Sequence, residues 1–151
     1  MSAVLRDLGA DFAVVDERGR VTIVVEAKKV DADTTWAEEW FDLFKANRGG
    51  DSEFVLLATP RAIYVWRPSQ VERTPAGVID GREAFTAYLR GRDRDAAQLT
   101  GAAFEFLVGA WLNDVAQKFW SPSRPDEVSL FIETGLRAAF ENGRVVRSLP
   151  A

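Results

Sequence analysis

Residues 11–29 read DFAVVDERGRVTIVVEAKK and decide the expected fold. Two valine-rich runs, at 12–15 and 21–30, flank the polar segment DERGR. Such runs on either side of a glycine-containing polar segment are typical of two strands joined by a tight turn. The stretch therefore predicts a β-hairpin whose second strand ends in the charged tripeptide EAK.

The register of this hairpin decides whether its charged side chains meet. A turn centred between Arg18 and Gly19 places Asp11 opposite Glu26, with their Cβ atoms about 4.5–5.5 Å apart. Because successive side chains of a strand point to opposite faces, Lys28 shares the face of Glu26. A one-residue slip would separate these groups. The sequence thus predicts that two carboxylates and one ammonium group converge.

These three side chains suit a metal and a phosphate. Two adjacent carboxylates repel one another, and a divalent cation between them removes the repulsion. Oxygen atoms of Asp11, Glu26 and the Ala27 backbone carbonyl are suitable ligands for Mg²⁺ or Mn²⁺. Lys28 would stabilise a phosphate or orient an attacking water, as phosphodiester hydrolysis requires. In the alternative interpretation, Glu26 and Lys28 form a surface ion pair that contributes little to stability.

The composition removes several classes of chemistry. The 151-residue chain contains no cysteine and no histidine, so it has no residues for a Ser-His-Asp triad, a cysteine nucleophile or a common zinc site. Its formal net charge of −4 weighs against broad, non-specific nucleic-acid binding. The first residues lack signal-peptide features, and no long apolar run follows. We therefore expect a cytoplasmic protein that does not enter the membrane.

The rest of the chain predicts a mixed α/β or α+β domain. After the hairpin we expect a helix, two strands, a short helix and two longer helices, the last two over 98–120 and 126–143. We divide the chain into a core, residues 1–95, and a helical C-terminal appendage, residues 96–151, within one compact domain. Apolar residues at helical spacing lead us to expect that the appendage packs on the sheet, on a second copy of the chain or on a partner protein. These residues are Phe104, Leu107, Trp111, Leu112, Val115 and Phe119.

The stretch ADFAVVDERGRVTIVVEAKK resembles the core of the PD-(D/E)XK nuclease superfamily, in which an acidic residue opens one strand and E-x-K ends the next. Asp11 corresponds to the family aspartate, Glu26 to the second acidic residue and Lys28 to the lysine. The order through EFVLLATPRAIYVWR is similar to the N-terminal nuclease domain of type I restriction enzyme R subunits. The resemblance implies a restriction-endonuclease-like mixed central sheet flanked by helices. It also implies Mg²⁺- or Mn²⁺-dependent cleavage of DNA in defence, restriction or repair.

Two other hypotheses stay open. The helix after Lys28 carries Glu38 and Glu39 where related enzymes often have a glutamine, and the C-terminal segment is rich in phenylalanine and tryptophan. A catalytically inactive nuclease-fold module that docks through its C-terminal helices is therefore the alternative function. The remaining hypothesis is an unrelated α/β domain in which the E-x-K match arises by chance.

Basic and aromatic side chains along the predicted core are candidates for nucleic-acid contact. Lys29, Arg61 and Arg67 could bind backbone phosphates. Aromatic side chains could stack on bases, although packing in the core is the stronger interpretation for Trp36, Trp40 and Trp66.

Overall fold

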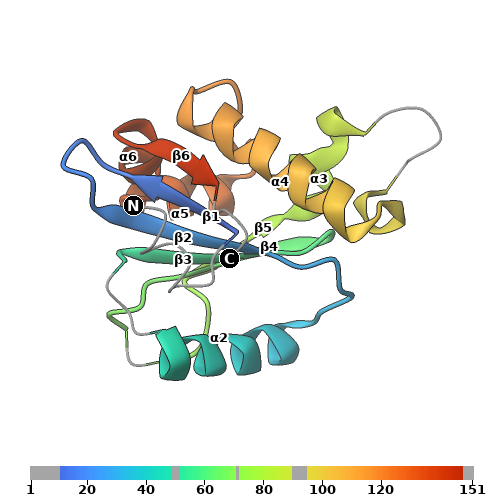
Figure 1. The fold of residues 1–151 in the computed structure, drawn as a ribbon, viewed down its shortest axis with the longest axis horizontal. Coiled ribbons are helices and arrows are strands. Elements are labelled where there is room, and N and C mark those ends of the chain that lie inside the picture. Colours follow the sequence, from blue (N-terminus) through green and yellow to red (C-terminus); the bar gives the residue numbers. More distant parts are fainter. Residues whose placement is uncertain (1–10, 49–51, 71, 90–94, 148–151) are drawn as a thin grey trace.

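The computed structural model describes residues 11–48, 52–70, 72–89 and 95–147. These residues form a mixed six-stranded sheet in the order β5-β4-β3-β2-β1-β6, with helices on both faces (Figure 1). The predicted mixed α/β class is confirmed. The strands are β1 (Phe12–Val15), β2 (Val21–Ala27), β3 (Phe54–Ala58), β4 (Ala62–Trp66), β5 (Gly77–Asp80) and β6 (Arg144–Arg147). The helices are α2 (Thr34–Arg48), α3 (Gly81–Phe85), α4 (Gly101–Ala116), α5 (Pro125–Glu133) and α6 (Leu136–Glu141), with short 3₁₀ helices η1 (Thr86–Tyr88) and η2 (Ala96–Gln98).

The β1–β2 hairpin has the predicted register, with Phe12 opposite Val25. Next to the turn, a β-bulge shifts the pairing by one residue. The turn requires a residue in the left-handed region, and Gly19 supplies it with a φ of 82°. The Asp16 carboxylate accepts two backbone hydrogen bonds of 2.9 Å inside the turn. These contacts fix the register and therefore decide which side chains of β2 share a face.

α2 connects the parallel strands β2 and β3 and covers one face of the sheet (Figure 1). Asp33 caps this helix, because its carboxylate accepts a 2.9 Å hydrogen bond from the N–H of Trp36. Phe41 is fully buried and stacks on the buried ring of Trp66, with ring centroids 4.6 Å apart. Trp40 and Trp66 pack between α2 and the sheet, whereas Trp36 is 37% exposed.

The opposite face of the sheet carries the larger core, beneath α3 to α6 (Figure 1). One cluster of buried side chains joins strand residues to helix residues from the C-terminal segment, among them Phe12, Val25, Phe104, Trp111 and Phe140. Residues 96–147 therefore share one hydrophobic core with the first five strands.

The C-terminal segment also contributes a strand, which the sequence analysis did not predict. β6 pairs antiparallel with β1 and places Arg147 opposite Phe12. Its sequence, RVVR, has four residues, too few for a recognisable alternating pattern. The segment 96–147 is therefore not purely helical, and it supplies one edge of the sheet.

Two helices differ from the prediction for local reasons. The helix expected over 126–143 is divided into α5 and α6, because Gly135 adopts a φ of 87°, which a regular helix does not allow. The helix expected over 98–120 ends at Ala116, so Phe119 lies beyond it, is 76% exposed and does not pack on the sheet. None of the described helices has the length and hydropathy needed to cross a membrane.

Candidate active site

The candidate site lies where β2 ends and β1 begins. Val25 belongs to the core beneath α4, so the neighbouring side chain of Glu26 points to the opposite face of the sheet. Lys28 Nζ lies 3.4 Å from Glu26 Oε1, which places both charged groups on the same side, as the alternation predicts. The Lys28 side chain is 37% exposed and that of Glu26 is 17% exposed. The pair is therefore accessible to a ligand from solvent.

Asp11 lies immediately before β1 and is bonded to the end of β2. Its backbone N–H donates a 3.1 Å hydrogen bond to the carbonyl of Val25. Its carboxylate oxygen Oδ2 accepts a 2.7 Å hydrogen bond from the backbone N–H of Ala27. The strand pairing itself ends at Phe12, so Asp11 reaches the E-x-K segment through its side chain. The structure thus joins Asp11 to the residue between Glu26 and Lys28.

The backbone of Ala27 is oriented towards Asp11. Lys28 donates its backbone N–H to the carbonyl of Ala58, on the β3 side of β2. Peptide groups of successive strand residues alternate in direction, while the N–H and C=O of one residue point the same way. Because the Ala27 N–H is bonded to the Asp11 carboxylate, the Ala27 carbonyl also faces the β1 side. The carbonyl that the sequence analysis named as a metal ligand therefore projects towards the Asp11 side of β2.

Burial raises the pKa of the Asp11 carboxyl above its ordinary value. The hydrogen bond from the Ala27 N–H acts in the opposite direction, because it stabilises the ionised form. Among nearby charges, Glu105 raises the pKa of Asp11, while Lys28 and Arg147 lower it. The net effect is that this carboxylate is harder to ionise than an exposed aspartate, in the absence of a bound cation.

Glu105 and Arg147 were not predicted as site residues. Arg147 ends β6, one strand from Asp11, and its Nη2 lies 3.4 Å from Oε1 of Glu105 on α4. Both residues belong to the segment assigned to the helical appendage. The two valines of RVVR are the local sign of a strand here, and four residues are too few to predict one.

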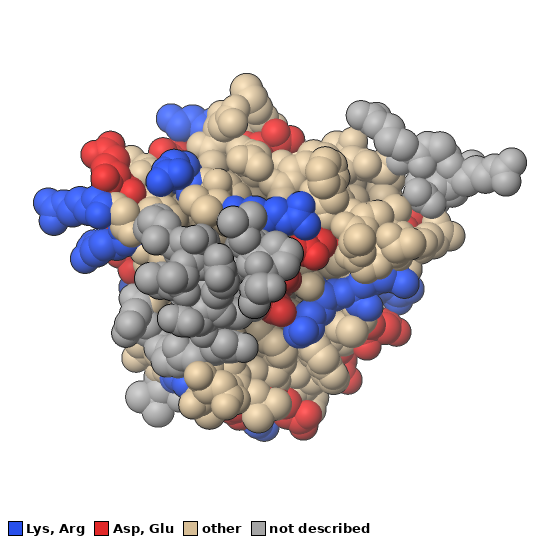
Figure 2. All heavy atoms as spheres, viewed as in Figure 1, with Lys and Arg blue, Asp and Glu red and all other residues tan. Residues whose placement is uncertain are grey.

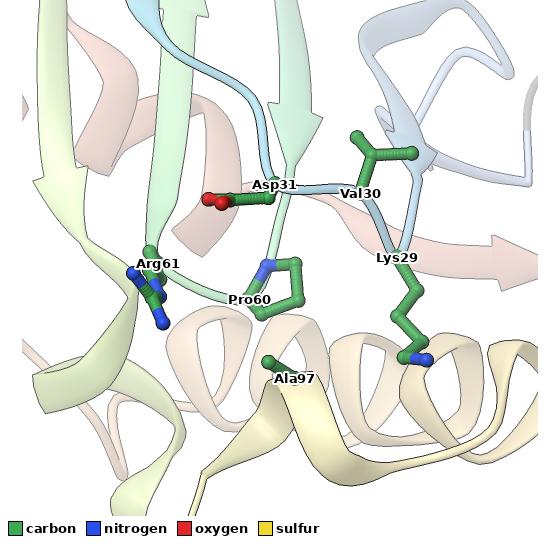
Figure 3. Close-up of a pocket in the computed structure, with 6 residues that line it drawn as sticks. All are labelled: Lys29, Val30, Asp31, Pro60, Arg61 and Ala97. Atoms are coloured by element: carbon green, nitrogen blue, oxygen red, sulfur yellow. The ribbon is translucent and has the colours of Figure 1, made fainter.

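A cavity of about 320 Å³ adjoins the site at Lys29. Its lining combines the segment after β2, the turn between β3 and β4, and η2, through Lys29, Val30, Asp31, Pro60, Arg61 and Ala97. Figure 3 shows the side chains of Lys29 and Arg61 on either side of Pro60, with Ala97 beneath. Two of the three residues predicted to contact nucleic acid therefore line one cavity.

Arg67, the third predicted contact, lies elsewhere. It follows the other end of β4 and its guanidinium sits 5.8 Å from the centroid of the Phe54 ring. On the face shown in Figure 2, basic side chains alternate with acidic ones instead of forming one broad basic surface. Nucleic-acid contact on this face would therefore depend on a few individual basic side chains and not on a broad positive surface.

The donor set fits a hard divalent cation with an open coordination sphere. Within the described ranges, no group of three or more Asp, Glu, His or Cys side chains could hold a metal by itself. Asp11, Glu26 and the Ala27 carbonyl offer only oxygen atoms. Mg²⁺ is commonly held by one or two carboxylates, with water and substrate phosphate completing its coordination. The site therefore offers the type of donor atom that such a cation binds.

Comparison with known proteins gave no relatives: no family model, no curated protein and no solved structure matches the chain.

Proposed function

We propose that this protein is a metal-dependent nuclease that hydrolyses phosphodiester bonds of DNA, with Asp11, Glu26 and Lys28 as its catalytic residues. The observation that carries the proposal is the 2.7 Å hydrogen bond between the Asp11 carboxylate and the N–H of Ala27. This bond ties the acidic residue before β1 to the E-x-K segment that ends β2. The proposal extends to a restriction-endonuclease-like core and to a cytoplasmic role in defence, restriction or repair.

The order of elements supports this core. An acidic residue precedes β1, a hairpin leads to β2, and α2 then returns the chain to β3, which runs parallel to β2. This order agrees with the PD-(D/E)XK resemblance of the sequence. The hydrogen bond between Asp11 and the central residue of E-x-K favours this resemblance over a chance match.

The carboxylates of Asp11 and Glu26 and the carbonyl of Ala27 would hold Mg²⁺ or Mn²⁺. When bound, such a cation lowers the pKa of water and neutralises charge that develops on the phosphate. Asp11 must be ionised for this role, and its buried position opposes ionisation. The Ala27 N–H orients the carboxylate through Oδ2 and leaves Oδ1 as the candidate ligand atom.

Lys28 would act on the phosphate. Its ammonium group is partly exposed and only 3.4 Å from Glu26, so it lies beside a candidate metal ligand and is open to substrate. A cation in this place stabilises the negative charge that grows on the phosphate oxygens as water attacks. Hydrolysis then breaks one P–O ester bond and leaves a phosphate on one product and a hydroxyl on the other.

A second candidate function is a non-catalytic module that binds another protein. Large apolar side chains are exposed on and after the C-terminal helices: Phe106 by 71%, Phe119 by 76% and Ile132 by 62%. In this case the Glu26–Lys28 pair would be a surface ion pair of little energetic value. The two functions are distinguished by catalysis at the candidate site.

The test is cleavage of plasmid DNA, linear duplex DNA and RNA in Mg²⁺ or Mn²⁺. We expect Glu26→Gln and Lys28→Met each to lower the cleavage rate by about 10²-fold or more. Glu17→Gln is the matched control, because Glu17 is an exposed acid in the turn at the other end of the hairpin. Cleavage that persists in both site variants, or its absence in the wild type, would contradict the proposed function.

A further inference from the structure

The cavity beside the candidate active site has fixed walls. On one side, the Lys28 N–H is bonded to Ala58, and the Val30 N–H donates a 2.9 Å hydrogen bond to the carbonyl of Lys28. On the other side, Thr59 closes the turn that presents Pro60 and Arg61, because its N–H and hydroxyl both donate to the carbonyl of Ala62, at 2.9 and 2.7 Å. Lys29 and Arg61 therefore project from two segments whose backbones are held in place.

Gly81 holds the turn that carries Arg61 in place on the side away from the cavity. Its N–H donates a 3.0 Å hydrogen bond to the carbonyl of Arg61. A Cβ atom at position 81 would lie 2.7 Å from backbone atoms of Pro60 and Arg61, so only glycine permits this approach. The turn that carries Arg61 is thus packed directly on the start of α3, and the cavity is formed before any ligand binds.

The charge of the lining differs from that of the chain. The lining carries two cationic side chains, Lys29 and Arg61, and one carboxylate, Asp31, while the whole chain has a formal net charge of −4. Lys29 and Arg61 are exposed at the rim, where an anionic ligand can reach them. A locally positive rim on an acidic protein favours a phosphate-bearing ligand at this place.

The floor and the size of the cavity restrict the ligand further. Pro60 is buried and lies between the two cations, with Ala97 of η2 beneath it (Figure 3). These two residues give an apolar surface on which a base or sugar could rest. A volume of about 320 Å³ is at the lower end of the range for small-molecule pockets, about 300–1,000 Å³. The cavity therefore suits a single nucleotide and not a base-paired duplex.

We propose that this cavity binds one nucleotide of a single strand next to the phosphodiester that is cleaved. Lys29 and Arg61 bind its backbone phosphate, and Pro60 and Ala97 contact its base or sugar. This inference rests on the proposed nuclease function, and the link between the two is Lys29, which lines the cavity and follows Lys28 in the chain. It adds that the strand is held unpaired where it is cut.

The experiment measures binding of a fluorescein-labelled single-stranded deoxyoligonucleotide in EDTA, so that the metal site does not contribute. We expect Lys29→Gln and Arg61→Gln each to weaken binding about tenfold, the loss expected for one charge-assisted contact. Each variant should also lower the slope of log affinity against log salt by about 0.7, as for one lost phosphate contact on a single strand. Ala97→Leu, which fills the floor without changing charge, should weaken binding but leave the salt slope unchanged.

Arg18→Gln is the matched control, since Arg18 is an exposed arginine in the turn of the β1–β2 hairpin. Wild-type affinity in all three cavity variants, or an equal loss in Arg18→Gln, would overturn the proposal. It would also be overturned if deoxyadenosine monophosphate bound as tightly as the oligonucleotide, because the ligand would then be a free nucleotide. Far-ultraviolet circular dichroism and a melting curve establish that each variant is folded.

The failure of this proposal is distinguishable from failure of the nuclease function. Wild-type cleavage in Mg²⁺ with unchanged binding in the cavity variants contradicts the nucleotide site alone. Binding that depends on Lys29 and Arg61, without cleavage in Mg²⁺ or Mn²⁺, contradicts the nuclease function and leaves a nucleic-acid-binding cavity.

Discussion

The Asp11 carboxylate accepts a 2.7 Å hydrogen bond from the backbone N–H of Ala27. This contact joins the start of β1 to the end of β2 at the residue between Glu26 and Lys28. It holds a half-buried carboxylate in one orientation, with one oxygen towards the strand backbone. A buried, oriented carboxylate is costly for folding and useful for metal binding, and this conflict leads to the first two predictions.

Asp11→Asn should stabilise the metal-free protein at neutral pH. The folded chain holds the Asp11 proton to a higher pH than the unfolded chain, because burial raises the pKa of this carboxyl. The free energy of unfolding therefore falls as the pH rises from the ordinary pKa of aspartate to the raised value in the folded state. Asparagine removes this loss and keeps an oxygen that can accept from Ala27. Urea unfolding at pH 7 should show the gain, and the gain should vanish below about pH 3.5.

Asp16→Asn is the control of opposite sign. The backbone N–H of Arg20 and the other hydrogen bonds of the turn lower the pKa of Asp16. Its stabilising contribution is therefore present above the ordinary pKa of aspartate, and it is lost as the pH falls through the lowered value. Asp16→Asn should destabilise the protein at pH 7. An Asp11→Asn variant that is less stable than the wild type at pH 7 would contradict the account of Asp11.

The pH dependence of cleavage should respond to Glu105 and Arg147 in opposite directions. A proton on Asp11 competes with the metal, so the cleavage rate should rise with pH as Asp11 ionises. Glu105 raises the pKa of Asp11 and Arg147 lowers it. Glu105→Gln should therefore shift the acidic limb of the pH–rate profile to lower pH, and Arg147→Gln should shift it to higher pH. Shifts in the same direction, or none, would show that Asp11 does not control this limb.

Gly81→Ala should destabilise the protein. Its Cβ would lie 2.7 Å from backbone atoms of the turn at Pro60 and Arg61, which cannot move without breaking the turn. We expect a loss of about 1–3 kcal/mol, measured by urea unfolding. Gly101→Ala is the matched control, because a Cβ there meets no atom within 4 Å at the start of α4. That variant should be neutral or up to about 1 kcal/mol more stable. Equal effects would contradict the close approach.

Phe104 and Phe106 of α4 provide a matched pair of variants that tests whether α4 and the sheet share one core. Phe104 is 1% exposed and packs edge-to-face on Phe85, whereas Phe106 is 71% exposed. Phe104→Ala should lower the free energy of unfolding by about 3–5 kcal/mol. Phe106→Ala should change it by less than about 0.5 kcal/mol. Similar values for the two variants would indicate that α4 does not pack on the sheet as described. If Phe106 is covered by a partner protein, its substitution should weaken that association without affecting the isolated chain.

The hairpin and its charges could be predicted from sequence because the relevant information is local. The glycine in DERGR fixed the turn, and strict alternation along β2 placed Glu26 and Lys28 on one side. The 2.7 Å contact with Ala27 could not be predicted, because Asp11 lies just outside the strand pairing.

Features that depend on long-range packing were missed. β6 reaches β1 from more than a hundred residues away along the chain, and four residues carry too little pattern to reveal it. Arg147 comes near Asp11 through that pairing, and Glu105 through the packing of α4 on the sheet. The helix break at Gly135 was also missed. The glycine was visible in the sequence, but the apolar residues on both sides of it keep helical spacing and so indicated one continuous helix. Phe119 was placed on the same helix face as Phe104 and Trp111 from its spacing, but the helix ends before it and Phe119 is exposed.

The account rests above all on a divalent cation held by Asp11 and Glu26, and calorimetric titration of Mn²⁺ or Mg²⁺ into the protein tests this most directly. We predict one binding site per chain, lost in Asp11→Asn and in Glu26→Gln and retained in Glu17→Gln. Affinity should increase with pH as the Asp11 carboxyl loses its proton. The absence of binding to the wild type, or equal binding to the wild type and Asp11→Asn, would contradict the account.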